Sequence, residues 1–192
     1  METIDVKNLI TIYSEATPNP ETMKFVLNRF LLPNDTADFP DVASAAQSPL
    51  ALELFETFGA VRGVFIMNNF VTITKSEDTD WFDLIPPMKE FIKNYVADEK
   101  PVIHPKTDDE SGENDTEVVK KIKELLDNHV KPAVEMDGGA ISFKSFDHGV
   151  VTVVLKGSCS GCPSSTITLK AGIEGLLKRM VPEVSEVVAE SM

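Results

Sequence analysis

Cysteine is scarce in this 192-residue chain: only Cys159 and Cys162 are present, separated by two residues. At this spacing two sulfurs can face one point, so the pair suits metal chelation or disulfide formation. Protein sites built from thiolates usually have about four ligands, and no nearby histidine completes a set here. The pair is therefore expected either to do two-thiol redox chemistry or to form half of a metal site that a second chain completes.

Long apolar runs and excess positive charge are missing too. No stretch approaches the roughly 18 to 20 apolar residues of a membrane span. The first residues, Met1 to Asp5, lack the features of a secretory signal and are acidic where a mitochondrial transit peptide is rich in arginine. The formal net charge of −13 disfavours nucleic acid and anionic membranes as main partners. We therefore expect a cytoplasmic protein whose two cysteines remain thiols.

Residues 97–116 mark the clearest boundary in the chain. They combine proline, glycine, serine and seven acidic residues with only two basic ones, and they lack apolar periodicity. This composition is typical of a solvated linker. The sequence thus predicts an N-terminal domain over 1–96, an acidic flexible linker over 97–116 and a C-terminal domain over 117–192.

The N-terminal part alternates strand and helix patterns. Strands are expected at Leu9–Ser14 and Met23–Leu27, and a hairpin is expected from Val61–Met67 and Phe70–Thr74. Apolar periodicity predicts a helix over Leu50–Phe58, with Gly59 as its C-cap. A second helix is predicted over Asp80–Val96, where Pro86 and Pro87 should delay the regular part until after residue 86.

The C-terminal part shows a similar mixture. A helix capped by Thr116 is expected to run to Val130, followed by a turn at Asp137–Gly139. A hairpin of Ala140–Phe146 and Val150–Leu155 should follow, then a helix over Pro163–Met180 and a short strand at Val184–Ala189. The inward side chains of that helix are predicted to be Leu169, Ile173, Leu176, Leu177 and Met180. Overall the fold class is α+β, with two small α/β-sandwich-type domains.

The surroundings of the two cysteines favour a thiolate. Pro163 suits the first position of a helix, so Cys162 is expected to be its N-cap residue. A helix N-terminus carries partial positive charge, which lowers the pKa of a nearby thiol. The glycines and serines around the pair leave room for a second copy of the loop to approach.

Besides an iron–sulfur site shared by two chains, two other functions fit a lone pair of cysteines. A dithiol oxidoreductase also places its motif before a helix, but no aromatic residue precedes Cys159, and the order hairpin, loop, helix does not predict the expected βαβ unit. A zinc site shared by two chains has the right number of ligands. Spacing alone does not separate these alternatives from an iron–sulfur site.

The segment around the cysteines resembles the C-terminal domain of NifU. The similar residues are Gly157–Thr166 and Thr168–Glu174. Upstream, Lys131-Pro132 and Asp137–Gly139 resemble the Arg-Pro and Asp-Gly-Gly-Asp elements of that family, although lysine replaces arginine and Ala140 stands where the last acid often lies.

The N-terminal half resembles the domain that precedes this module in Nfu-type proteins. The matching positions are Thr17–Pro20, Lys24-Phe25, Ser48–Ala51, Leu54-Phe55, Gly59, Val64-Phe65 and Asn69–Lys75. The two resemblances occur in the family's order and together span nearly the whole chain outside the linker.

The resemblance implies an iron–sulfur cluster scaffold and carrier, not an enzyme. In that family a [4Fe–4S] cluster is held between two protomers and passed to apo-proteins. Cys159 and Cys162 would be the cluster and metal ligands of each chain in a holo homodimer, although four thiolates can also hold [2Fe–2S]. The implied partners are apo client proteins and an upstream cluster donor, and the N-terminal domain would select among them.

Several other residues have plainer expected roles. His104, His129 and His148 have no ligand spacing to the cysteines and should lie at the surface or at a helix end. The Thr17–Pro20 segment is expected to be a rigid turn, with a recognition loop as the alternative. Trp81 and Phe82 are expected to pack in a core, with a partner-binding surface as the alternative. Gly172 and Gly175 are expected to allow close packing near the cysteine loop.

Overall fold

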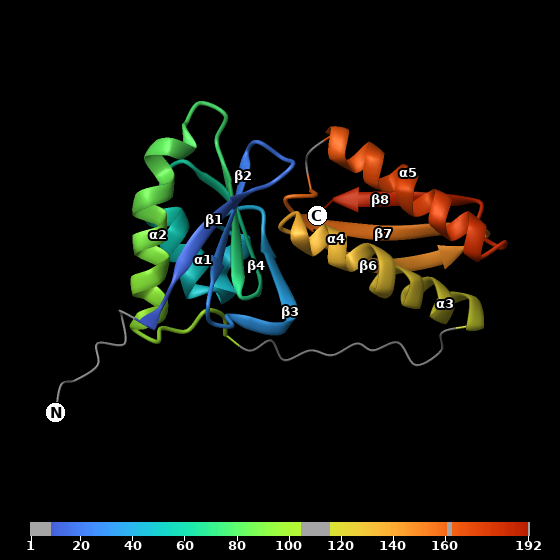
Figure 1. Cartoon of the computed structure of the whole chain (residues 1–192), viewed down its shortest axis with the longest axis horizontal. Helices are drawn as coiled ribbons and strands as arrows, with labels where there is room; N and C mark the ends of the chain where they lie inside the picture. Colours follow the sequence, from blue (N-terminus) through green and yellow to red (C-terminus); the bar gives the residue numbers. More distant parts are fainter. Residues whose placement is uncertain (1–8, 105–115, 161–162, 192) are drawn as a thin grey trace. The chain divides into compact units, whose positions relative to one another are not determined.

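The structure is a computed structural model that describes residues 9–104, 116–160 and 163–191. Contacts divide the chain into two compact units, Met1–Pro105 and Lys106–Met192, and each unit has its own hydrophobic core (Figure 1). Both units combine helices with a β-sheet, so the expected α+β class is confirmed. Among the described residues, no helix is both long and apolar enough to cross a membrane.

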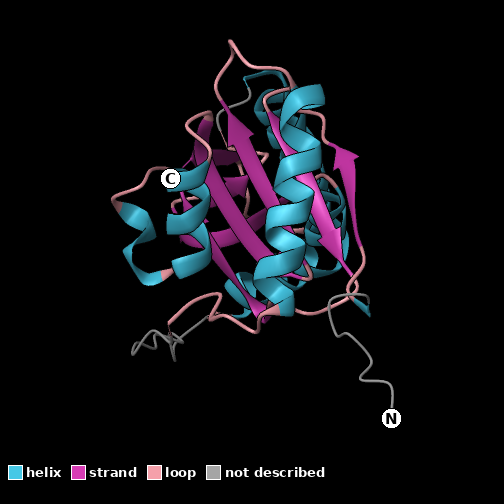
Figure 2. Ribbon diagram, turned by 90° about the vertical axis from the view of Figure 1, so that its left-hand side faces the viewer, coloured by secondary structure: helices cyan, strands magenta, loops and turns pink. Residues whose placement is uncertain are grey.

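The N-terminal domain is built on an antiparallel sheet with the strand order β1-β2-β5-β4-β3. Its helices α1 and α2 cover one face of that sheet (Figure 2). The elements are β1 (Ile12–Ala16), β2 (Thr22–Leu27), β3 (Leu32–Phe39), α1 (Pro49–Thr57), β4 (Val61–Asn68), β5 (Phe70–Lys75) and α2 (Trp81–Ala97), with a short 3-10 helix at Ser44–Gln47 before α1.

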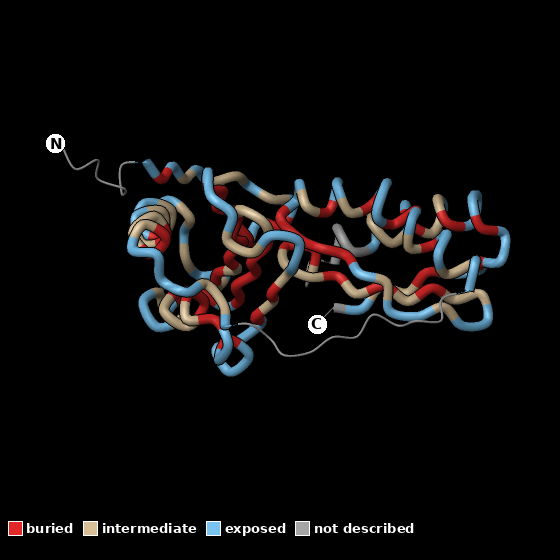
Figure 3. The backbone as a smooth tube through the Cα atoms, turned by 90° about the horizontal axis from the view of Figure 1, so that it is seen from below, coloured by how far each residue is buried: buried red, intermediate tan, exposed pale blue. Residues whose placement is uncertain are grey.

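Alternation along the strands explains which face is covered. Every second residue of β2 joins the core beneath the helices, namely Met23, Phe25 and Leu27, and α2 adds Met88 and Ile92 from one side of the helix. Figure 3 shows these buried stretches in red along the strands and along the inner side of the helices. Apolar side chains recur at every second residue of the strands and about every 3.6 residues of the helices, and the two sets therefore pack together in one layer.

Two expectations for this domain need correction. Phe58, in an extended conformation, caps α1, and Gly59 is not among the glycines with positive φ. The helix α2 begins at Trp81, after Asp80 accepts a hydrogen bond from the Phe82 backbone N–H. The prolines at 86 and 87 lie inside it. Because proline has no N–H, the carbonyls four residues earlier lack their helical hydrogen bond. Those residues are exposed in the first turn, so water can hydrogen-bond to the carbonyls.

The strand β3 was not expected from the sequence. It contains Pro33 and Asn34, and its pairing with β4 is irregular between Leu32 and Thr36. Asn34 has a φ of 60°, in the left-handed region. An irregular edge strand of this kind lacks the apolar alternation by which strands are recognised.

Residues 98–104, which composition assigned to the linker, lie against the N-terminal domain. Val102 and Ile103 pack on its core, and the His104 backbone N–H donates to the Gln47 carbonyl at 2.8 Å. The Tyr95 hydroxyl donates to the Pro101 carbonyl at 2.7 Å. Burial raises the pKa of Tyr95 to about 12, and the Glu53 carboxylate contributes to that rise.

Ser48 connects this returning segment to α1, and its replacement should weaken the domain. Its buried Oγ accepts from the Ala51 N–H at 3.2 Å and donates to the Val102 carbonyl at 2.6 Å. Ser48→Ala removes a helix cap and leaves a carbonyl unsatisfied, so we expect a loss of about 2 kcal/mol. Urea unfolding followed through Trp81, the only tryptophan, measures it. The exposed Thr57→Ala at the end of α1 is the control, and equal midpoints for both variants would refute the prediction.

The C-terminal domain has a three-stranded sheet with the order β6-β7-β8. The strand β6 pairs antiparallel with β7, and β8 pairs parallel with β7. The elements are α3 (Glu117–Leu125), a π-helical turn (Leu126–Val130), α4 (Lys131–Met136), β6 (Gly139–Asp147), β7 (Val150–Gly157), α5 (Pro163–Met180) and β8 (Glu186–Ser191).

This topology corrects the argument against a redox protein. Because β8 is parallel to β7 and α5 connects them, β7, α5 and β8 form a βαβ unit. The order hairpin, loop, helix did not predict such a unit, since the partner of the last strand is not visible locally. The β6–β7 hairpin itself is confirmed, with His148 and Gly149 at positive φ in its two-residue turn.

The first helix of this domain was expected to stop at Val130, but helical structure continues to Met136. Thr116 caps it as expected and accepts from the Val119 N–H. Pro132 has no N–H for the regular bond one turn back, and the chain widens into a π-helical turn just before it. Lys131 binds Asp127 across this turn, with Nζ to Oδ1 at 2.7 Å.

Candidate functional site

Cys159 lies in the connection between β7 and α5. The strand ends at Gly157, which has a φ of 66°, and the Ser160 N–H donates to the Gly157 carbonyl at 3.0 Å. The helix α5 begins at Pro163. Cys162, the second predicted ligand, lies outside the described residues, and so does its expected role as N-cap. The chain thus places Cys159 at a strand–turn–helix junction.

The Asp137–Gly139 turn lies beside this junction. The β6–β7 register pairs Gly139 with Gly157, and the Ser158 N–H donates to the Gly138 carbonyl at 3.3 Å. The Ser158 hydroxyl also donates to the Asp137 carbonyl. The expected turn is confirmed, with Gly138 at a φ of 81°, and its backbone carbonyls anchor the start of the cysteine loop.

Gly139 is in direct contact with Cys159, a role that the sequence did not reveal. A Cβ atom on Gly139 would lie 2.9 Å from Cys159 Sγ and 2.6 Å from the Lys156 carbonyl oxygen. Close approach, not an unusual φ, therefore requires glycine here. The two glycines of the turn were a visible signal, but only the strand register shows what they contact.

The Cys159 side chain is buried, with 5% of its surface exposed, and it belongs to the core of the C-terminal domain. Its Sγ lies 3.9 Å from the Ser158 hydroxyl oxygen. The sulfur is thus held between a glycine, a hydroxyl group and apolar side chains. Holding a cluster shared with another chain would require this sulfur to turn outward.

The helix that follows the loop is tied to the sheet through Glu174. One carboxylate oxygen accepts from the Val187 N–H of β8 at 3.1 Å, and the other accepts from Lys178 Nζ at 2.5 Å. The Lys178 hydrogen bond, followed by the Val187 one, lowers the pKa of the Glu174 carboxyl. Ile173 and Leu177 on the same helix are buried, which fixes α5 relative to the strands.

Two expectations for α5 were wrong. Met180 is 43% exposed instead of facing inward, whereas Leu169 and Leu176 are partly buried as expected. Gly172 and Gly175 are exposed, and a Cβ on either would meet nothing within 4 Å. These glycines therefore do not serve close packing within the described part of the chain.

The remaining candidates divide between core and surface. Trp81 packs edge-on against Phe25 and donates from Nε1 to the Pro20 carbonyl at 3.0 Å, as a core residue should. Phe82 is 84% exposed, so its predicted burial was wrong. The Thr17–Pro20 turn is held by Thr17 Oγ1, which donates to the Asn19 carbonyl at 2.9 Å and so confirms a rigid turn.

The described part of the chain contains no cluster of metal-ligating side chains. The histidines at 104, 129 and 148 are all exposed. Among described residues, no group of three or more histidine, cysteine or acidic side chains is placed to hold a metal ion. Any thiolate site must therefore be built around the cysteine loop.

Comparison with known proteins bears on both domains. Residues 12–99 match the family described as scaffold protein Nfu/NifU N terminal, and residues 122–188 match the NifU-like domain. The solution structure of a NifU-like protein from Saccharomyces cerevisiae aligns with a TM-score of 0.46 and 22% identity, over 50% of this chain and 87% of that one.

Two relatives match almost the whole chain. The protein named NFU1 iron-sulfur cluster scaffold homolog, mitochondrial, of Drosophila willistoni is 43% identical over 94% of this chain and 64% of its own length. The protein of the same name from Homo sapiens is 44% identical over 92% of this chain and 70% of its own. The chain thus spans about two thirds of the length of these relatives. With both domain models matched in order, the chain belongs to the Nfu/NifU scaffold family.

Proposed function

We propose that this chain is an iron–sulfur cluster scaffold and carrier. Two protomers would hold one [4Fe–4S] cluster through Cys159 and Cys162 of each and pass it to apo-proteins. The observation that carries the proposal is the position of Cys159 at a strand–turn–helix junction, in a chain with one other cysteine and no described metal-binding cluster. The names of the relatives as iron–sulfur cluster scaffolds support it.

The chemistry of such a site is ligand exchange, so the chain would act without being an enzyme. The cluster is the cargo, and a thiolate of the recipient would replace a donor thiolate on iron one at a time. The nearby start of α5 would favour the thiolate form of its ligands. Since each chain supplies only half of the ligands, separation of the protomers would help to release the cargo.

The two domains would divide the work. Residues 117–192 would hold the cluster, the N-terminal domain with the segment 98–104 packed on it would recognise apo client proteins and the upstream donor, and the acidic segment after His104 would tether the two. The curated relatives named above are mitochondrial, and the cytoplasmic location expected from the sequence remains a prediction.

A dithiol oxidoreductase is the second candidate, because the β7–α5–β8 unit places the cysteine loop before the helix of a parallel crossover. It requires a reversible disulfide between Cys159 and Cys162 and turnover in insulin reduction. Buried Cys159 would have to turn outward to attack an external disulfide, as it would to bind a shared cluster, so the names of the relatives, not burial, favour the carrier.

Anaerobic reconstitution with iron and sulfide tests the proposal. We expect about four iron and four sulfide per two chains, as a [4Fe–4S] centre contains, and a change from apo monomer to holo dimer in size-exclusion chromatography. Tight binding of one zinc per dimer without iron uptake would instead establish a zinc adaptor. Disulfide reductase activity without cluster binding would establish the oxidoreductase.

A further inference from the structure

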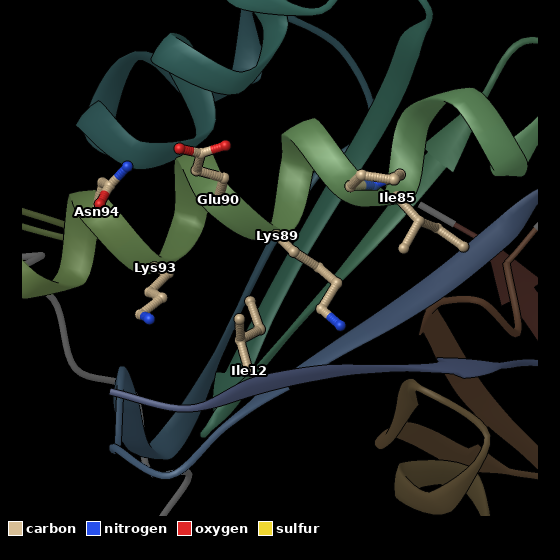
Figure 4. A pocket seen from close by; sticks show the side chains of 7 residues that line it. Ile12, Ile85, Lys89, Glu90, Lys93 and Asn94 are labelled. Atoms are coloured by element: carbon tan, nitrogen blue, oxygen red, sulfur yellow. The ribbon is translucent and has the colours of Figure 1, made fainter. Parts of the chain in front are cut away.

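A groove runs between α2 and the edge strand β1 of the N-terminal domain (Figure 4). Its volume is about 580 Å³. The apolar part of its lining comes from Ile12 of β1 and from Ile85 and Pro86 of α2. Lys89 and Lys93 form its basic part, and Glu90 and Asn94 complete the lining. The groove therefore offers both apolar contact and positive charge on one short surface.

The two lysines stand out in a chain with a net charge of −13. They lie one helical turn apart, and both side chains extend from α2 toward β1 (Figure 4), while Glu90 also contributes to the lining of the groove. Within the described residues, neither lysine forms an ion pair, although most other basic residues of this domain do or donate to a carbonyl. Their charge is thus available to a carboxylate from outside.

The apolar part continues along the helix toward its N-terminus. Phe82 precedes Ile85 by three residues and Pro86 by four, so all three share one helical face. Phe82 is 84% exposed and Pro86 is also exposed, while Ile12 and Ile85 are half-buried. One end of the surface is therefore apolar and the other end is cationic, which defines a direction for a bound segment.

We propose that this groove docks an acidic segment of a client protein, in which a bulky apolar side chain is flanked by carboxylates. The apolar side chain would contact Phe82, Ile85 and Ile12, and the carboxylates would pair with Lys89 and Lys93. This rests on the proposed role of the N-terminal domain in client recognition. The acidic linker of this chain fits less well, because residues 106–115 contain five acids but no apolar side chain.

Fluorescence anisotropy of labelled peptides on the full-length apo chain tests the groove. The probe is Leu-Leu-Glu-Glu-Glu, compared with peptides carrying lysine for glutamate or serine for leucine. We expect the probe, but neither of the two altered peptides, to bind saturably. Its affinity should be about tenfold weaker for the Lys89→Gln/Lys93→Gln double variant, as the loss of two ion pairs predicts. The matched control, Lys120→Gln/Lys121→Gln, makes the same change in net charge on α3 and should bind like the unmodified chain.

Equal weakening by both double variants would overturn the proposal, since net charge alone would then explain it. Equal binding of the serine peptide would also overturn it. If the probe binds only after deletion of residues 107–115, the linker of this chain occupies the groove instead of a client segment. Reconstitution of the Lys89→Gln/Lys93→Gln variant should give full cluster content. If peptides bind but neither the unmodified chain nor any variant takes up a cluster, the proposed carrier function is refuted, whereas the groove remains a peptide-binding site.

Discussion

Replacement of either cysteine by serine is expected to abolish stable cluster binding. In the proposed site each chain would supply two thiolates, so Cys159→Ser or Cys162→Ser would remove two of the four ligands of the shared cluster. A serine hydroxyl remains protonated at neutral pH and is a poor ligand for iron in such a site. Iron and sulfide content after anaerobic reconstitution, together with visible absorbance, measures the loss, which should be nearly complete.

The control for this result lies within the same loop. Ser160→Ala changes a residue between the two cysteines without touching a thiol, and should retain the cluster. Because Cys159 is buried in the core, a serine there introduces a hydroxyl into apolar surroundings, so far-UV dichroism of each apo variant must match the unmodified chain. A Cys159→Ser chain that folds and still takes up a full cluster would refute the ligand assignment.

Gly139→Ala is expected to destabilise the C-terminal domain by about 2–3 kcal/mol, a typical cost of overpacking. The new methyl group would lie 2.6 Å from the Lys156 carbonyl oxygen and 2.9 Å from Cys159 Sγ. That carbonyl belongs to the β6–β7 ladder, where Lys156 pairs with Ala140, so it cannot move without breaking the pairing. The cysteine side chain would be displaced as well, and cluster retention should fall.

Two readouts separate this effect from general damage. Thermal unfolding by far-UV dichroism should show the loss, while the fluorescence of Trp81, which lies in the N-terminal domain, should not change. Gly172→Ala is the matched control: the added methyl group faces open space on α5, and replacing a helical glycine should stabilise by about 0.5–1 kcal/mol. Equal stability of Gly139→Ala and the unmodified chain would contradict the contact.

Elements that depend on neighbouring residues were predictable from the sequence. The β4–β5 and β6–β7 hairpins have local turn residues, and α5 has a long apolar period after Pro163. The continuation of helical structure to Met136 was not, because Pro132 normally ends a helix and a π-helical turn leaves no simple signature. The parallel pairing of β8 with β7 was also missed, since it joins residues more than 30 positions apart.

At the candidate site, too, local features were predictable from the sequence and long-range contacts were not. Cys159 and Cys162 are recognisable because they are the only cysteines and lie together. The contact between Gly139 and Cys159 joins residues that are adjacent only once the β6–β7 register is known. Sequence therefore identifies the reactive atoms, whereas the supporting backbone around them requires the fold.

The burial of Cys159 has a consequence for its oxidation. Oxidation of cysteine to sulfenic and higher acids requires an accessible thiolate, and only 5% of this residue's surface is exposed. Peroxide should therefore modify Cys159 slowly. Were this sulfur a cluster ligand, as proposed, the packing that hides it would also protect the site from the loss of a thiolate.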